Sequence, residues 1–161
     1  RPEDRPQWAA LWHGYLEFYE TALPDAVYDS TFARLLGDDP QDFSALVAEA
    51  DGRLVGLTHY LFHRHAWKIE NVCYLQDLYA APEARGKGIG RALIEGVYEA
   101  ADRAGAPTVY WLTQEFNHTA RQINRTFKAR TFMAGLEFPD GAIVAHKSNR
   151  ISTHYRRDSG V

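Results

Sequence analysis

Cysteine is almost absent from this chain of 161 residues, because Cys73 is the only one. A single cysteine excludes an internal disulfide, so we expect a reducing, cytoplasmic setting. No signal peptide is visible in the sequence, and no apolar run approaches the roughly 20 residues that a membrane helix needs. A net charge of −3 gives no reason to expect a nucleic-acid partner. We therefore expect neither a membrane nor a nucleic acid as partner.

The composition is that of an ordinary globular protein, with 45% hydrophobic residues. The length predicts one domain over residues 1–161 with a sizeable core.

One segment, residues 72–104, organises the rest of the chain. It predicts a strand from Val72 to Ala80, a glycine-rich turn, and a helix from Ile89 to Ala104 that Gly105-Ala106-Pro107 ends. The turn places three glycines at alternate positions, which lets a ligand approach the backbone closely. Backbone amides at the start of the helix and nearby basic side chains then favour a bound pyrophosphate.

Two common phosphate-binding loops do not match this turn. The nucleotide P-loop requires GxxxxGK followed by Ser or Thr, whereas Lys87 lies between glycines with no hydroxyl after it. The dinucleotide fingerprint GxGxxG requires a different third spacing and an acidic residue about 20 positions later. A nucleotide-phosphate binder is therefore a weak alternative.

A third pattern does match. The segment Arg85-Gly86-Lys87-Gly88-Ile89-Gly90 fits R/Q-x-x-G-x-G/A, and Asn117-His118-Thr119-Ala120 follows downstream. With these motifs the chain resembles the GNAT superfamily of N-acetyltransferases over roughly residues 5–124. The resemblance is closest to the histone and polyamine (small-amine) branch, in segments 8–19, 75–93 and 110–120. It implies an α/β fold whose mixed central sheet, with helices on both faces, is splayed at the acetyl-CoA site.

The same resemblance implies how the cosubstrate acetyl-CoA is held. Backbone groups of the strand end pair with the pantetheine arm, and the turn and its flanks bind the diphosphate. For Asn117 a plain helix N-cap is as well supported as contact with the cofactor. The implied cofactor-binding residues are Leu78, Tyr79, Ala80, Arg85, Gly86, Lys87, Gly88, Ile89, Gly90, Arg91 and Asn117.

Two residues are expected to carry the acid–base chemistry. Asp77 is the carboxylate nearest the strand end, and it is either the base that receives the amine proton or a buried, hydrogen-bonded acid that stabilises a bulge. Related enzymes have a tyrosine as general acid where this chain has Asn124, which cannot donate a proton in that way. We therefore expect Tyr155, in a final strand at 151–156, or solvent to replace it. Residues 125–150 depart from the family pattern.

The N-terminal half predicts helices at 7–20 and 29–36, the second capped by Asp29 or Ser30. The first helix carries an apolar stripe expected to face the core and, by resemblance, to border the acceptor site: Trp8, Leu11, Trp12, Tyr15, Leu16 and Tyr19. Aspartates at 25, 29, 38, 39 and 42 are read as a solvated face or as an attraction for polyamines.

Strands are expected at 43–50 and 53–66, joined by an Asp51-Gly52 hairpin turn, and at 108–113. On the second strand His59, His63 and His65 share a face. Without a cysteine or carboxylate at ligand spacing, that face is interpreted as polar cleft lining or exposed surface, and no metal is expected. Strands at 131–138 and 142–146 around a Phe138–Gly141 turn indicate an extra hairpin, a diverged helix end or a disordered segment. Cys73 is expected in the core.

These features favour an enzyme that moves an acetyl group directly from acetyl-CoA to a primary amine of a small molecule, polyamine or protein lysine. An acyl-CoA-binding protein with little or no transferase activity is the alternative, motivated by Asn124. By resemblance, a homodimer is expected.

Overall fold

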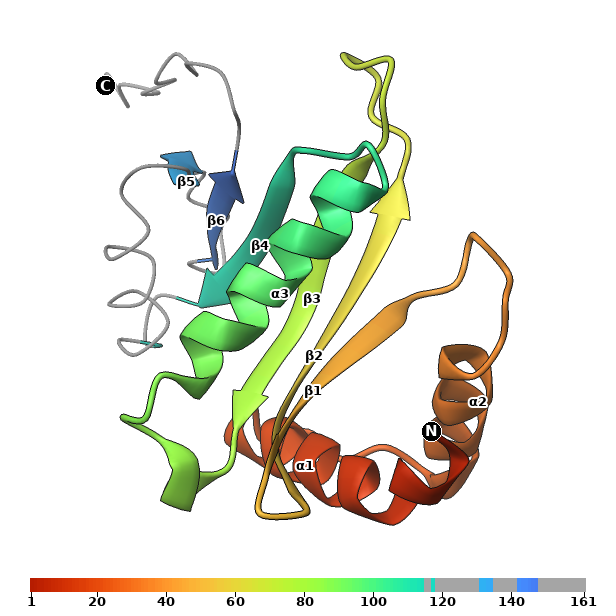
Figure 1. The fold of residues 1–161 in the computed structure, drawn as a ribbon, viewed down its shortest axis with the longest axis vertical. Coiled ribbons are helices and arrows are strands. Elements are labelled where there is room, and N and C mark those ends of the chain that lie inside the picture. Colours follow the sequence, from red (N-terminus) through yellow and green to blue (C-terminus); the bar gives the residue numbers. More distant parts are fainter. Residues whose placement is uncertain (115–116, 118–130, 135–141, 148–161) are drawn as a thin grey trace, which may run out of the picture.

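The computed structural model of this chain describes residues 1–114, 117, 131–134 and 142–147 (Figure 1). The helices are η1 (Pro2–Asp4), α1 (Arg5–Phe18), α2 (Asp25–Leu35), η2 (Pro82–Ala84) and α3 (Ile89–Arg103). The strands are β1 (Ser44–Ala50), β2 (Arg53–His63), β3 (Val72–Ala80), β4 (Val109–Gln114), β5 (Thr131–Ala134) and β6 (Ala142–Lys147). Among the described residues, no helix combines the length and apolar character needed to cross a membrane.

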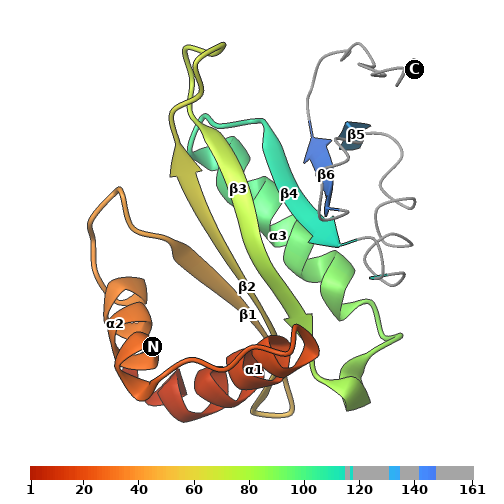
Figure 2. The same cartoon turned by 180° about the vertical axis from the view of Figure 1, so that it is seen from behind.

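The described strands form one mixed sheet in the order β1-β2-β3-β4-β6-β5. Only the β3–β4 pair is parallel, and α3 makes the crossover between these two strands. Helix α3 covers one face of the sheet, and α1 with α2 lies on the other, as the two opposite views show (Figure 1, Figure 2). The expected mixed α/β architecture is confirmed.

Helix α3 is amphipathic, and its buried side faces β1, β2 and β3. Ile94, Val97 and Ala101 are buried in one cluster with Cys73, and Leu93 is buried as well. The helix ends before Gly105, whose φ of 65° is favourable only for glycine. Cys73 is fully buried here, which confirms its expected core position.

Helix α1 uses its aromatic stripe to build a second core. Trp8, Leu11, Trp12 and Leu16 are buried with Phe32 of α2 and with residues of β2. The Trp8 ring centroid lies 5.0 Å from that of Phe32 and 5.2 Å from that of Trp12. The core-facing role predicted for the stripe is thus confirmed for these four residues.

The predicted turn between β1 and β2 is also confirmed. Asp51 has φ 50° and Gly52 φ 73°, which are the positive values of a two-residue hairpin turn. The turn fixes the β1–β2 register, and the pairing runs from Ala50–Arg53 to Ser44–Tyr60.

Two predicted boundaries are wrong. The second helix begins at Asp25 with Pro24 as N-cap, not near Asp29, because proline fits the extended conformation before a helix. Asp29 lies inside α2 and forms an ion pair with Arg5 of α1. Strand β2 ends at His63 and not at Ala66, since residues 66 and 67 already form a turn.

Near the C-terminus, β5 and β6 pair antiparallel, which decides for the hairpin over the helix end. The part of the predicted first strand beyond Ala134 lies outside the described residues, as do Asn124, the predicted final strand at 151–156 and Tyr155.

Candidate functional site

The sheet opens between its two central strands. The β3–β4 ladder consists of two residue pairs, Cys73–Val109 and Tyr74–Tyr110. Beyond them β3 continues to Ala80 and β4 to Gln114 without pairing to each other. The edge of β3 facing β4 therefore has no strand partner over its C-terminal half, so an extended ligand could add there as a strand does.

A bulge in β3 lies at the same level. The β2–β3 register shifts so that Asp77 is opposite His59 while Leu75 is opposite Tyr60, which leaves Gln76 as the extra residue. Bulges increase local twist and redirect side chains. The bulge and the splay that the family resemblance implied are both present, and together they turn the last residues of β3 away from β4.

Strand β3 leads through η2 into the glycine loop. Gly86 has φ 75° and Gly88, the N-cap of α3, has φ 82°. A Cβ at either position would meet no atom within 4 Å, so the loop presents open backbone at a helix N-terminus. Unpaired amides and the helix dipole make such a terminus suited to a phosphate.

Gly56 of β2 brings the start of α3 close to the sheet. A Cβ there would lie 2.7 Å from Cγ2 of Ile89 and 3.0 Å from the carbonyl oxygen of Tyr79. The absence of that Cβ therefore sets the distance between the glycine loop and the end of β3.

The basic residues of the loop differ in their surroundings. Arg85 donates from Nε to the carbonyl oxygen of Ala80 at 3.2 Å, and its guanidinium lies 5.7 Å from the centroid of the Tyr79 ring. Arg91 pairs with Glu95 one turn along α3 at 3.9 Å. Lys87 is exposed between the two positive-φ glycines. Arg85 thus ties the loop to the strand end, while the exposed Lys87 adds positive charge to the loop.

The side chain of Asp77 lies on the face of the sheet that α1 covers. Asp77 is 7% exposed and its Oδ2 accepts from Nδ1 of His59 at 2.8 Å and from the indole of Trp12 at 3.3 Å. The indole of Trp8 in turn donates to Nε2 of His59 at 2.9 Å. Two tryptophans of α1 and a histidine of β2 therefore hold the carboxylate beside the open part of the sheet.

Tyrosines of α1 continue this polar row. Burial and the nearby Asp77 charge raise the pKa of Tyr15 well above its usual range. The Tyr15 ring packs edge-on against Tyr19 with 5.0 Å between centroids. Nδ2 of Asn117, beyond β4, donates to the Tyr19 hydroxyl at 3.3 Å. The row thus links α1 to the segment that follows β4.

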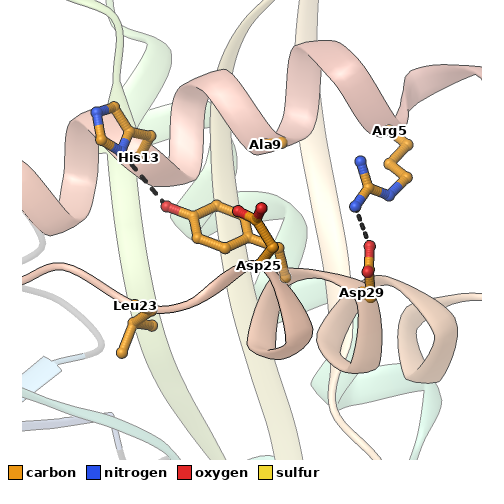
Figure 3. A pocket seen from close by; sticks show the side chains of 7 residues that line it. Arg5, Ala9, His13, Leu23, Asp25 and Asp29 are labelled. Carbon is orange, nitrogen blue, oxygen red and sulfur yellow. Dashed lines mark hydrogen bonds and ion pairs between the residues drawn. The ribbon is translucent and has the colours of Figure 1, made fainter.

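An open hollow of about 520 Å³ lies between α1 and α2 (Figure 3). The Arg5–Asp29 ion pair stands at one end, and the hydroxyl of Tyr28 lies 3.5 Å from Nδ1 of His13 at the other. The Tyr28 ring also packs on Trp12, with 4.9 Å between centroids. The hollow is therefore separated from Asp77 by this aromatic layer.

The structure brings together most of the residues that the sequence singled out. Asp77 and Leu78–Ala80 lie on β3, and residues 85–91 lie in the loop and the first turn of α3.

The structure also shows a contact that sequence reasoning missed. His59 is 2% exposed, so the interpretation of its face as cleft lining or surface is wrong at this position. A carboxylate partner for it does exist, but on another strand, so spacing along the chain could not reveal it.

In the sequence, the only feature that pointed to the contact between His59 and Asp77 was the face that His59 shares with other histidines on β2. His63, four residues further along the chain on the same face, instead contacts the hydroxyl of Tyr110 through Nε2 at 2.7 Å. In the described part of the chain, no group of three or more His, Cys, Asp or Glu side chains could hold a metal ion.

A strand end that opens beside a glycine-rich helix N-terminus, with a buried carboxylate next to it, defines an acyl-CoA-dependent acyltransferase. Residues 8–125 match the model of the acetyltransferase (GNAT) family, and the chain belongs to that family. It is an N-acetyltransferase that transfers acetyl groups to amines, and the family uses acetyl-CoA as cosubstrate.

Similar proteins carry related names. The chain is 42% identical over 121 residues to a D-amino-acid N-acetyltransferase of Saccharomyces cerevisiae, covering 74% of this chain and 75% of the relative. It is 35% identical over 102 residues to a thialysine N-epsilon-acetyltransferase of Sus scrofa, covering 58% of this chain and 59% of the relative. The matched segment thus spans less than two thirds of that second relative.

Solved structures support the fold. A ribosomal-protein-alanine N-acetyltransferase from Brucella melitensis superposes with a TM-score of 0.69 at 23% identity, covering 91% of this chain and 95% of that one. A probable acetyltransferase gives a TM-score of 0.71 at 21% identity, covering 94% and 95%. At such identities the likeness shows the fold alone.

Proposed function

We propose that this enzyme transfers the acetyl group of acetyl-CoA directly to the primary amine of a small, amino-acid-like acceptor. The single observation that carries the proposal is the end of the β3–β4 ladder at Tyr74–Tyr110, with Asp77 and the glycine loop on the unpaired continuation. Support for the acceptor class comes from the relatives named for D-amino acids and thialysine. Polyamines and protein lysines are the competing acceptors.

In this proposal the cosubstrate lies along the unpaired edge of β3. Backbone groups of Leu78, Tyr79 and Ala80 pair with its pantetheine arm. The amides from Gly86 to Gly90 hold the diphosphate, with Arg85, Lys87 and Arg91 supplying charge. Support for this fit is the open space around Gly86 and Gly88 and the missing strand partner. When bound, acetyl-CoA supplies an acyl group activated as a thioester.

Asp77 is proposed to act on the acceptor amine. A lysine-like amine has a reference pKa near 10.4, so neutralising it at pH 7 costs about 4 to 5 kcal/mol. A carboxylate beside the open part of the sheet attracts the ammonium form and accepts its proton, directly or through water. The position of Asp77 on the face covered by α1 supports this role, with Tyr15 and Tyr19 as aromatic neighbours of the amine.

Two further residues complete the proposed site. Asn117 follows β4 and contacts Tyr19 of the row beside Asp77, which supports its assignment to the cofactor side. Tyr155, outside the described residues, is proposed as the general acid in place of the family tyrosine, because Asn124 has no acidic proton to give. A thiolate with a reference pKa near 8.5 needs only modest help to leave.

The test is a thiol-release assay with acetyl-CoA over matched acceptors, namely D- and L-amino acids, thialysine, polyamines and basic peptides, with product masses measured. We expect turnover on amino acids or thialysine, and a loss of about 10²- to 10⁴-fold in kcat/KM for Asp77→Asn. Tyr155→Phe should lower kcat. Turnover confined to polyamines or peptides would reject the acceptor class, and full activity of Asp77→Asn would reject the base.

We also propose that the protein acts in the cytoplasm as a homodimer made of one domain per chain, with no metal, nucleic acid or membrane partner. Support for the compartment is the buried thiol of Cys73, and support against nucleic acid is the net charge of −3. Light scattering at several protein concentrations tests the dimer. A monomer at all concentrations would contradict it.

A further inference from the structure

A buried histidine beside the proposed base has no role in the chemistry described so far. His59 lies in the middle of β2, is 2% exposed, and uses both ring nitrogens. Nδ1 faces Oδ2 of Asp77 at 2.8 Å, and Nε2 faces Nε1 of Trp8 at 2.9 Å. A buried imidazole with two partners on opposite sides has a fixed position and a restricted protonation state.

The partner on the Nε2 side decides that state. The indole nitrogen of tryptophan is a donor only, so Nε2 of His59 has to present its lone pair. A neutral imidazole with a lone pair at Nε2 carries its proton at Nδ1, and that proton is donated to Asp77. A second proton at Nε2 would point at the indole N–H. The charged form of His59 is therefore incompatible with the Trp8 contact.

This constraint matters for Asp77. An imidazolium at 2.8 Å would compensate the charge of the carboxylate, whereas a neutral ring orients the carboxylate and leaves its negative charge in place. Among the described residues, no lysine or arginine lies within ion-pair distance of Asp77, and its closest basic neighbour is His59 itself. Whether the negative charge of Asp77 is compensated therefore depends on the protonation state of His59.

Within the described part of the chain, few other titratable groups surround His59. From β3 Asp77 faces it, and from α1 the titratable neighbour is Tyr15, close to the same carboxylate. From α2, Tyr28 lies behind Trp8 with 6.2 Å between ring centroids. The Phe43 ring before β1, at 6.2 Å, and the two indoles add only apolar or donor surface.

We propose that His59 is a positioning residue that Trp8 holds in the neutral Nδ1–H form, so that Asp77 stays an uncompensated, oriented anion while it receives the acceptor amine. The proposal rests on the role of Asp77 given under "Proposed function". It adds two residues to the site, and neither of them touches the substrate.

Nitrogen-15 NMR of labelled histidine in the wild-type protein tests the tautomer without any assay of activity. We expect the His59 signals, assigned by their loss in His59→Gln, to show a protonated Nδ1 and an unprotonated Nε2 at the pH of the activity assay. An Nε2–H tautomer, or an imidazolium at that pH, would overturn the proposal. The protonation state is read in the wild-type protein, and the His59→Gln variant serves only to assign the signals.

The activity test compares two variants of α1 that each remove one indole donor. Trp8→Phe frees Nε2 to take a proton, so the pH profile of kcat/KM should gain an acid limb within the pH 5 to 8 range in which histidines titrate. The loss should reach about 10-fold within one pH unit below the new midpoint, as a single protonation requires. His59→Gln in the Trp8→Phe background should remove that limb.

Trp12→Phe is the matched control, because it deletes a donor to Asp77 and leaves the Trp8–His59 contact intact. We expect it to lower kcat/KM at every pH without a new acid limb. Identical pH profiles for Trp8→Phe and Trp12→Phe would overturn the proposal. Absence of acetyl transfer by the wild-type protein would instead reject the proposed function, while the NMR spectrum would still decide the tautomer.

Discussion

The hydroxyl of Tyr79 occupies the space that a Cβ on Gly14 would need. An ideal Cβ on Gly14 would lie 2.5 Å from the Tyr79 oxygen and 2.9 Å from the adjacent ring carbon. Helix α1 can therefore lie directly over the end of β3, and Tyr79 in turn supports Arg85 of the glycine loop. A glycine in the middle of a helix is thus connected, through one tyrosine, to the proposed diphosphate site.

Gly14→Ala should consequently disturb both stability and cofactor binding. Alanine favours the helix by about 1 kcal/mol, but overpacking against a held aromatic ring costs about 1 to 3 kcal/mol. Gly96→Ala on α3 is the matched control, because its Cβ would meet only Cδ1 of Leu46, the end of a side chain that can move. In urea unfolding we expect Gly14→Ala to be less stable than Gly96→Ala by about 1 to 3 kcal/mol. Equal stabilities would contradict the packing argument.

Gly88→Ala should weaken CoA binding more than its effect on folding explains. Gly88 has φ 82° at the N-cap of α3, and a non-glycine residue in this region costs about 1 to 2 kcal/mol. Gly52→Ala, at φ 73° in the hairpin turn, carries the same backbone cost away from the loop. The two variants should have similar stability, and calorimetry should show a weaker affinity for CoA only in Gly88→Ala. Comparable CoA affinities would argue against the loop as the diphosphate site.

The thiol of Cys73 should be inert in the folded protein. Burial raises the pKa of Cys73 from 9.0 to about 12. Because the unfolded thiol ionises above pH 9 and the folded one does not, its contribution to stability is complete below pH 9 and is lost as the pH rises toward 12. The loss should be about 1.4 kcal/mol per pH unit within that window. Unfolding of wild type and Cys73→Ala at pH 8 and pH 10.5 measures it, and rapid labelling by a thiol reagent at pH 8 in native buffer would refute the prediction.

Tyr15→Phe should lower acetyl transfer without changing the alkaline side of the pH profile. Burial and the Asp77 charge raise the pKa of Tyr15 well above its usual range, so the phenol stays protonated at every pH at which the enzyme would be assayed. Its loss removes a polar neighbour of the proposed base, and a decrease of about 10-fold in kcat/KM corresponds to one hydrogen bond to a charged group. A basic limb that moves in the variant would show that Tyr15 titrates after all.

The local part of the fold could be predicted from the sequence. Strand β3 has the predicted bounds, and α3 begins at the predicted Ile89 and ends at Arg103, just ahead of the predicted stop at Gly105. The hairpin turn follows from Asp51-Gly52. Each of these features depends on residues close together in the chain, and that is the distance over which propensity, periodicity and turn chemistry act.

The contacts around Asp77 could not be predicted in this way. Trp8, His59 and Asp77 are separated by 51 and 18 positions, and only the packing of α1 on the sheet brings them together. The same holds for Gly14, whose need for a missing Cβ is visible only once Tyr79 lies over it. The start of α2 differs from the prediction for another reason. Asp29 is of a residue type that favours N-caps, but in this fold it lies inside the helix, where its carboxylate pairs with Arg5.

The unpaired stretch of β3 has a consequence for the protein before it meets its cosubstrate. A bare strand edge in the middle of a sheet is a template on which another chain can pair, and such edges promote aggregation. Occupation of the edge by coenzyme A also stabilises the native state by mass action, by about 2.7 kcal/mol at a hundredfold excess over its Kd. The lifetime of this protein in a cell is therefore expected to follow the supply of coenzyme A.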